Sequence, residues 1–147
     1  MNALPVTILL VEDDDIDALT VERCLKQAKI TNTLVRATDG VEALEMLRGN
    51  HTNVRLAAPY LLLVDIRMPR LDGIGLINEI RADPNLTRTV IFILTTSDAD
   101  RDKMAAYDAH VAGYIVKTGS SDQFLALATM LNYYLVIVEP PPVTRSG

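Results

Sequence analysis

The sequence has a single cysteine, no tryptophan and no excess of basic residues. Cys24 cannot close an internal disulfide alone, which fits a reducing compartment such as the cytoplasm. The 14 basic and 19 acidic residues give a net charge of −5, which disfavours non-specific electrostatic binding to nucleic acid or an anionic membrane. Apolar runs such as 60–64 and 90–94 are strand-sized and far short of the roughly 18 residues of a membrane span. We therefore expect a cytoplasmic protein that binds neither nucleic acid nor membrane.

Short apolar segments alternate with amphipathic segments along the chain. Strands are expected at 6–11, 33–37, 60–64, 90–94 and 113–116, and helices at 15–29, between Asp39 and Gly49, between Asp72 and Pro84, at 100–110, and from about Ser120 onwards. Three strands are almost continuously apolar, which is typical of parallel strands covered on both faces. The pattern predicts an α/β fold of the flavodoxin-like type, a doubly wound (βα)5 unit with a five-stranded parallel sheet.

One domain accounts for nearly the whole chain, because 147 residues is an ordinary length for a single domain. We expect this domain to span residues 5–138. The proline run at 140–142 ends regular structure, so residues 139–147 form a tail. Too few residues follow the fifth helix for a DNA-binding module. We therefore expect the protein to act by contacting another protein or by passing a chemical group on to one.

Charged and hydroxyl side chains follow four of the expected strands. They are Glu12, Asp13, Asp65, Thr95 and Lys117. The carboxyl ends of parallel strands share one edge of the sheet, so these side chains are expected in one crevice. Three carboxylates and one ammonium group give this crevice a net charge of −2, which a divalent cation neutralises. Hard oxygen ligands without nearby histidine or cysteine favour Mg²⁺.

Such a crevice suits phosphoryl transfer. Asp65 can attack phosphorus to form an acyl phosphate, while Mg²⁺ and Lys117 stabilise the charge on the transferred oxygens and Thr95 donates a hydrogen bond. Taken singly, each residue also has an ordinary structural interpretation, such as a helix cap, an exposed lysine or a β-branched strand residue. Their joint placement at four strand ends favours the functional interpretation.

The motifs resemble a receiver domain of two-component signalling, the CheY-like response-regulator family. They are Ile8–Asp13, Leu63–Pro69 followed by Asp72-Gly73, Leu94–Thr96, and Tyr114–Lys117, and the resemblance covers about residues 7–138. Each motif alone is weak, but their order and spacing together are specific. The resemblance implies a non-enzymatic protein that takes a phosphoryl group from a sensor histidine kinase and switches a protein-binding surface. An alternative is an intermediate that hands the group to a downstream His-containing phosphotransfer protein.

The resemblance also implies residue roles. Asp65 is the phosphoacceptor, and Asp13, Asp65 and the backbone carbonyl of Arg67 bind Mg²⁺, with Glu12 acting through water. Lys117 and Thr95 contact the phosphoryl group. Tyr114 matches the aromatic switch position, whose side chain follows the movement of Thr95. Gly73 fits the loop after the phosphoacceptor, where glycine permits an unusual φ.

Two positions depart from the family pattern. Thr118 replaces the usual proline after Lys117. Arg67 is bulky and cationic, so it either shields the acyl phosphate from water or pairs with its oxygens. The long loop at 49–59, the run at 94–97, the missing proline and the extended C-terminus resemble a narrower group, the stand-alone response regulators paired with bacterial phytochrome kinases.

Three other functions share parts of this pattern. A phosphatase of the haloacid dehalogenase type needs a second aspartate where Arg67 stands. A flavin-binding protein needs a phosphate-binding loop at the position where residues 12–15 are acidic. A degenerate receiver would lack some of the site residues, whereas this sequence has all of them.

The segment Asn132–Val138 is apolar nearly all round. Exposed apolar surface of that size is usually covered by a partner. We therefore expect a homodimer that uses the fifth helix and this C-terminal extension. The alternative is that Tyr134–Val138 folds back on its own domain.

Overall fold

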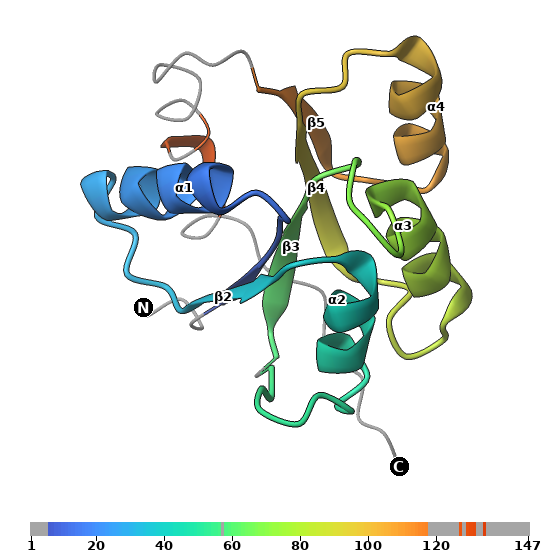
Figure 1. Ribbon diagram of the computed structural model, residues 1–147, viewed down its shortest axis with the longest axis horizontal. Coiled ribbons are helices and arrows are strands. Elements are labelled where there is room, and N and C mark those ends of the chain that lie inside the picture. The colour runs from blue at the N-terminus through green and yellow to red at the C-terminus, as the bar shows by residue number, and fades with distance from the viewer. Residues whose placement is uncertain (1–5, 57, 118–126, 128, 132–133, 135–147) are drawn as a thin grey trace.

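A computed structural model describes residues 6–56, 58–117, 127, 129–131 and 134. Five strands alternate with helices along this part of the chain (Figure 1). The elements are β1 (Thr7–Val11), α1 (Asp15–Gln27), β2 (Leu34–Ala37), α2 (Gly40–Leu47), β3 (Tyr60–Val64), α3 (Gly73–Ala82), β4 (Val90–Thr95), α4 (Asp100–Asp108) and β5 (Gly113–Val116). The predicted α/β alternation is confirmed, and the expected helix start near Ser120 lies outside the described residues.

The strands form one parallel sheet in the order β2-β1-β3-β4-β5. The strand order reverses between β1 and β3, so the crevice expected at such a switch point lies beside the ends of these two strands. In the register, Val11 pairs with Val64 and Thr95 pairs with Val116. The residues that follow these four positions therefore leave the sheet at one edge.

Helices cover both faces of the sheet, which explains the apolar strands. One face packs α2, α3 and α4 against side chains such as Leu9, Leu62 and Ile91. The other face packs α1 together with Leu127 and Leu131 against the alternate strand residues. Figure 1 shows α1 on one side of the sheet and α2 to α4 on the other. The fold is thus doubly wound, as predicted.

Acidic side chains cap three helices. Asp14, Asp39 and Asp72 each accept hydrogen bonds from backbone N–H groups in the first turn of α1, α2 and α3, respectively. Such caps satisfy donors that the helix itself leaves unpaired. Asp39 and Asp72 were the caps expected from the sequence, and Gly49 ends the second helical segment with φ of +75°.

Element ends differ slightly from the predicted ones. The first helix stops at Gln27 because Lys29 takes a left-handed φ of 59° and the N–H of Ile30 turns back to the Leu25 carbonyl at 2.9 Å. The fourth strand continues to Thr95 because that residue still pairs with β5.

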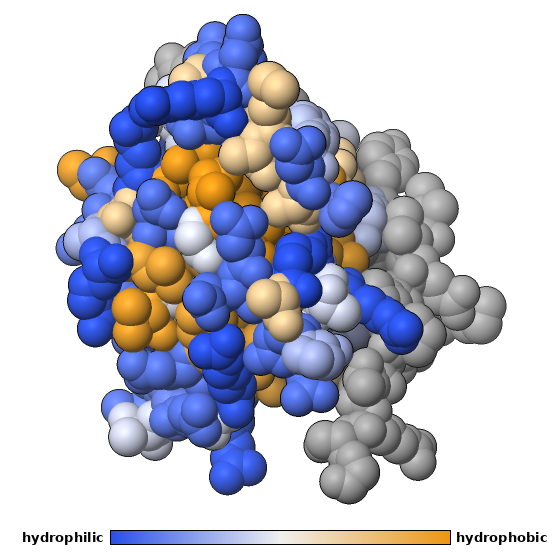
Figure 2. Space-filling view, turned by 90° about the vertical axis from the view of Figure 1, so that its right-hand side faces the viewer, coloured by the Kyte–Doolittle hydropathy of each residue, from blue (hydrophilic) through white to orange (hydrophobic). Residues whose placement is uncertain are grey.

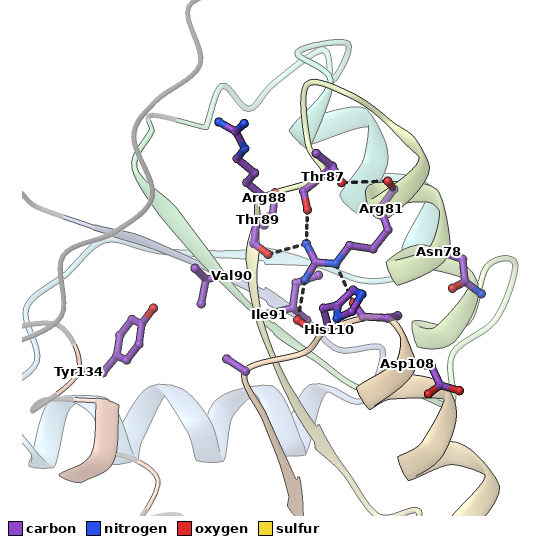
Figure 3. Close-up of a pocket in the computed structure, with 12 residues that line it drawn as sticks. Asn78, Arg81, Thr87, Arg88, Thr89, Val90, Ile91, Asp108, His110 and Tyr134 are labelled. Carbon is purple, nitrogen blue, oxygen red and sulfur yellow. Dashed lines mark hydrogen bonds between the residues drawn. The ribbon is translucent and has the colours of Figure 1, made fainter.

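Arg81 organises the edge of the sheet opposite the strand ends that carry the charged residues. Its guanidinium donates hydrogen bonds to four backbone carbonyls, those of Thr87, Thr89, Ala109 and His110, at 2.6–3.0 Å. Figure 3 shows these bonds beside a cavity of about 710 Å³. One side chain from α3 therefore fixes both the α3–β4 loop and the α4–β5 turn.

We expect Arg81→Ala to lower the free energy of unfolding by about 1–3 kcal/mol, because four carbonyls lose a charged donor and two of these bonds are partly buried. The measurement is urea unfolding of both proteins. Arg88→Ala is the matched control, since Arg88 lines the same cavity but is exposed. Equal losses in the two variants would contradict the role given to Arg81.

Candidate phosphoryl-transfer and metal site

Register and topology bring the predicted side chains together at the carboxyl edge of the sheet. Glu12 and Asp13 follow β1, and Asp65 follows β3 beside them, with its N–H bonded to the Val11 carbonyl at 3.0 Å. One carboxylate oxygen from each of these three residues lies within 4.8 Å of the others. The three carboxylates that were predicted to meet therefore lie together in the structure.

Lys117 enters the same cluster from the end of β5. Its Nζ donates to Glu12 Oε1 at 2.5 Å and to Asp17 Oδ2 at 2.9 Å, and lies 3.7 Å from Asp65 Oδ2. Burial favours the neutral amine, but the hydrogen bonds to Glu12 and Asp17 and the charge of Asp65 outweigh it and raise the pKa of Lys117. Lys117 is therefore the cation that balances the cluster.

Glu12 is almost completely buried, with 1% of its surface exposed. The pKa of Glu12 is raised from 4.5 to about 8, chiefly by burial. Repulsion from Asp65 also raises it, whereas the hydrogen bond with Lys117 lowers it. Burial therefore favours the neutral form of this carboxyl group, and Lys117 favours the charged form.

The raised pKa of Glu12 predicts a pH dependence of stability. Between about pH 4.5 and about pH 8, the folded protein keeps a proton that the unfolded chain has lost. The free energy of unfolding of the metal-free protein should therefore fall as the pH rises through this interval. Glu12→Gln should flatten that slope in urea unfolding with EDTA present, whereas the exposed control Glu22→Gln should keep it. A Glu12→Gln variant with the parental slope would contradict this assignment.

The cluster fits a hard divalent cation. Its donors are carboxylate oxygens, and Asp65 Oδ1 is buried with no hydrogen-bond partner. A buried oxygen without a partner is costly unless a ligand satisfies it. Asp13 is exposed, so its carboxylate leaves the site open to solvent on one side.

Thr95 and Tyr114 both connect to Ser97. Thr95 is fully buried, its Oγ1 accepts from the Ser97 N–H at 3.3 Å, and its carbonyl accepts from the Lys117 N–H at 2.6 Å. The Tyr114 hydroxyl donates to the Ser97 carbonyl at 2.8 Å, and burial raises the pKa of that hydroxyl. The two residues expected to move together thus share one neighbour.

The reason given for Gly73 from the sequence is wrong. Its φ is not left-handed; Arg70 is the loop residue with a positive φ, at 65°. Glycine is needed at 73 because a Cβ there would lie 2.3 Å from the Asp65 carbonyl oxygen and 2.7 Å from the Ile66 Cα. The first turn of α3 therefore packs directly on the backbone that carries Asp65.

Sequence reasoning missed two residues around the cluster. Asp17, in the first turn of α1, bonds Lys117, and Arg36 from β2 donates to the Glu12 carbonyl at 2.9 Å. A helix that begins directly after Glu12 and Asp13 places its first turn beside them, and this was the available signal for Asp17. Arg36 gave no such signal, because it lies in the middle of a strand.

Comparisons with known proteins agree with this geometry. Residues 8–129 match the family described as response regulator receiver domain. Response regulator Rcp1 from a Synechocystis strain is 33% identical over 138 residues, which cover 93% of this chain and 94% of Rcp1. The crystal structure of its Mn(2+)-bound form aligns with a TM-score of 0.83 and 32% identity, covering 94% of this chain and 100% of that chain. The phosphorylated cyanobacterial phytochrome response regulator RcpA aligns with a TM-score of 0.84 and 29% identity, covering 95% and 99%.

The chain belongs to the response regulator receiver domain family. It is a receiver-domain response regulator of two-component signalling, in which an aspartate is phosphorylated, and its relatives include phytochrome response regulators. Proteins of this family pair with sensor histidine kinases, bind divalent metal and generally act in signalling rather than as enzymes. Across the described ranges, no helix combines the length and apolar character needed to cross a membrane.

Proposed function

We propose that Asp65 accepts a phosphoryl group from a sensor histidine kinase with the help of Mg²⁺. The observation that carries this proposal is the environment of the Asp65 carboxylate. Oδ1 is buried without a hydrogen-bond partner, Oδ2 lies 3.7 Å from Lys117 Nζ, and two further carboxyl groups adjoin it. A nucleophile placed between a cation and a site for a metal suits phosphoryl transfer.

In the proposed reaction, an Asp65 carboxylate oxygen attacks the phosphorus of a phosphohistidine. The new P–O bond forms as the P–N bond breaks, and the electron pair stays on the imidazole nitrogen, which takes up a proton. Lys117 offers its ammonium group to the transferred oxygens, and the Thr95 hydroxyl offers a hydrogen bond. Both side chains come from strands that end at the same edge as Asp65.

Mg²⁺ would be held by Asp13, Asp65 and the backbone carbonyl of Arg67, with Glu12 acting through water. When bound, the ion neutralises charge on the transferring group and on the cluster. The hard oxygen donors and the unpartnered Oδ1 of Asp65 support this assignment.

We propose that the cognate kinase is a bacterial phytochrome kinase. The similarity to Rcp1 and RcpA over nearly the whole chain supports this partner. The first turns of α1 expose two apolar side chains, Ile16 at 76% and Leu19 at 44%, and Asp17 between them bonds Lys117. An apolar surface so close to the proposed nucleophile suits the docking of a partner helix.

The proposed output is a changed protein-binding surface within a cytoplasmic receiver domain at 5–138, with a tail at 139–147. Phosphorylation shifts a two-state equilibrium through Thr95 and Tyr114. The face that carries α3 and α4 shows apolar patches among polar side chains (Figure 2). On α4, Met104 is 66% exposed and Tyr107 is 52% exposed, so this helix has apolar surface that a partner can cover.

The direct test is incubation with acetyl phosphate and Mg²⁺, followed by intact mass measurement and mapping of the modified peptide. We expect a gain of one phosphoryl group on the peptide that contains Asp65, and no gain when EDTA removes the metal. Modification elsewhere, or gain without metal, would contradict the proposed site. Transfer from a phosphorylated phytochrome kinase, compared with transfer from an unrelated histidine kinase, tests the partner.

We further propose that two copies associate through the fifth helix and the segment 132–138. Of this segment the structure describes Tyr134, whose ring packs edge-on against Phe92 with centroids 5.4 Å apart. That contact supports, for Tyr134, the alternative in which the segment covers its own domain; residues 132, 133 and 135–138 lie outside the described residues.

We expect the full chain to sediment as a dimer and a chain ending at Asn132 to sediment as a monomer, because the truncation removes the apolar extension. A truncated chain that stays dimeric would place the interface elsewhere. Circular dichroism of the truncated chain checks that it remains folded.

A further inference from the structure

Asp102 joins two loops that leave the sheet beside the proposed phosphorylation site. It lies in the first turn of α4, and its side chain is 15% exposed. Its Oδ2 accepts a short hydrogen bond from Ser97 Oγ and lies 3.7 Å from Arg67 Nη2. Arg67 belongs to the β3–α3 loop and Ser97 to the β4–α4 loop, so Asp102 connects both loops to α4.

Arg67 is held at α4 and not at the carboxylate cluster. Its side chain is 63% exposed, and among the described residues Asp102 is the carboxylate within 4 Å of its guanidinium. A groove of about 550 Å³ between the β3–α3 loop and α4 is lined by both side chains. The guanidinium therefore has room to move, and it starts from a loop position two residues after Asp65.

Phosphorylation would create a second anion for Arg67. An acyl phosphate on Asp65 replaces one carboxylate charge by about two negative charges and offers several oxygens in the geometry that a guanidinium fork matches. The contact between Arg67 and Asp102 is a partly exposed pair at 3.7 Å, which is a weak type of ion pair. The two anions therefore compete for one arginine.

We propose that Asp102 is a positioning residue that holds Arg67 away from Asp65 and thereby shortens the lifetime of the acyl phosphate. This inference rests on the proposed function of Asp65. Acyl phosphate is lost when a water oxygen attacks phosphorus, the bond from phosphorus to the Asp65 oxygen breaks, and the carboxylate and inorganic phosphate separate. Arg67 paired with the phosphoryl oxygens covers them with a bulky group and restricts the approach of water.

The movement of Arg67 from Asp102 to the phosphoryl group also affects α4. When Arg67 moves, Asp102 keeps its hydrogen bond to Ser97 but loses its positive neighbour. Ser97 contacts both Thr95 and Tyr114 through its backbone. The charge at Asp65 is thereby linked to the first turn of α4 by a route that begins at Arg67, in addition to the route through Thr95.

The test is a double-mutant cycle on the half-life of the acyl phosphate in the full chain. Asp102→Asn removes the charge but keeps an oxygen that can accept from Ser97 Oγ, so the loop bond can survive. We expect Asp102→Asn to lengthen the half-life about two- to fivefold, the range that the loss of one exposed ion pair supports. In the Arg67→Gln background, Asp102→Asn should have no further effect. Asp100→Asn, which removes an equal charge from the same turn, should leave the half-life unchanged.

A direct readout is the ¹⁵N signal of the Arg67 Nε group. In the parent this signal should move on phosphorylation, and in Asp102→Asn the unphosphorylated protein should already lack the paired position. If the parent takes up the phosphoryl group but Asp102→Asn leaves the half-life unchanged, shortens it, or acts equally without Arg67, the inference is overturned while the proposed function stands. If the parent takes up no phosphoryl group, both are overturned.

Discussion

Asp65→Asn should abolish metal-dependent phosphorylation and, at the same time, stabilise the metal-free protein. The first effect follows because the amide is not a nucleophile. The second follows because Asp65 raises the pKa of Glu12 by repulsion and keeps a buried oxygen without a hydrogen-bond partner. Removing this charge should raise the free energy of unfolding by roughly 1–2 kcal/mol, less the lost attraction to Lys117.

The order of stabilities should reverse when Mg²⁺ is added. A ligand that binds the folded protein stabilises it in proportion to the logarithm of its concentration above Kd. The parent should gain stability from Mg²⁺, and Asp65→Asn should gain much less. Thermal unfolding with EDTA and with Mg²⁺ measures this. Asp14→Asn is the matched control, because asparagine also caps a helix and Asp14 is exposed beside the cluster. Phosphorylation of Asp65→Asn at the parental rate would contradict the assignment of the nucleophile.

Lys117→Met should cause the largest loss of stability among the single substitutions considered. The ammonium group donates to Glu12 and Asp17 and lies 3.7 Å from Asp65, while its own side chain is 4% exposed. At a pH where Glu12 is charged, removing Lys117 leaves that buried carboxylate without its cation, which costs about 3–5 kcal/mol. The variant should also accept phosphoryl groups poorly, since the transferred oxygens lose their protein cation.

The loss should depend on pH in a defined direction. Lys117 lowers the pKa of Glu12, so its removal costs least at a pH where Glu12 carries a proton in both proteins. The loss should grow as the pH rises and Glu12 becomes charged in the parent. Urea unfolding of Lys117→Met at several pH values measures this. Combining it with Glu12→Gln should recover much of the stability, while Lys103→Met, on an exposed pair with Asp98, should change little. A loss that is independent of pH would contradict the coupling with Glu12.

The sheet and the cluster could be predicted because both depend on backbone patterns. Apolar runs define parallel strands, and parallel strands end at one edge, so Glu12, Asp65 and Lys117 had to meet. Cap residues such as Asp72 were predictable for the same local reason. Family membership then favours the receiver interpretation over the hydrolase and flavin alternatives.

Contacts between side chains from distant elements could not be predicted in this way. Whether Arg67 reaches Asp102 or Asp65 depends on rotamers and loop paths that the sequence does not encode locally. The sequence does not distinguish Arg81 from other charged helix residues, although its guanidinium donates to four backbone carbonyls from two loops. The close approach behind Gly73 likewise depends on how α3 packs on Asp65, not on a turn type.

The ion pair that closes the cluster joins residues 105 positions apart, Glu12 and Lys117. Among the described residues β5 is the last strand along the chain, so the lysine is synthesised after the other four strands. A ribosome-bound chain that has not yet released residue 117 therefore has the acidic residues without their lysine. On the proposed function, we expect a nascent chain that has not reached residue 117 to accept phosphoryl groups poorly, because it lacks the cation of the site.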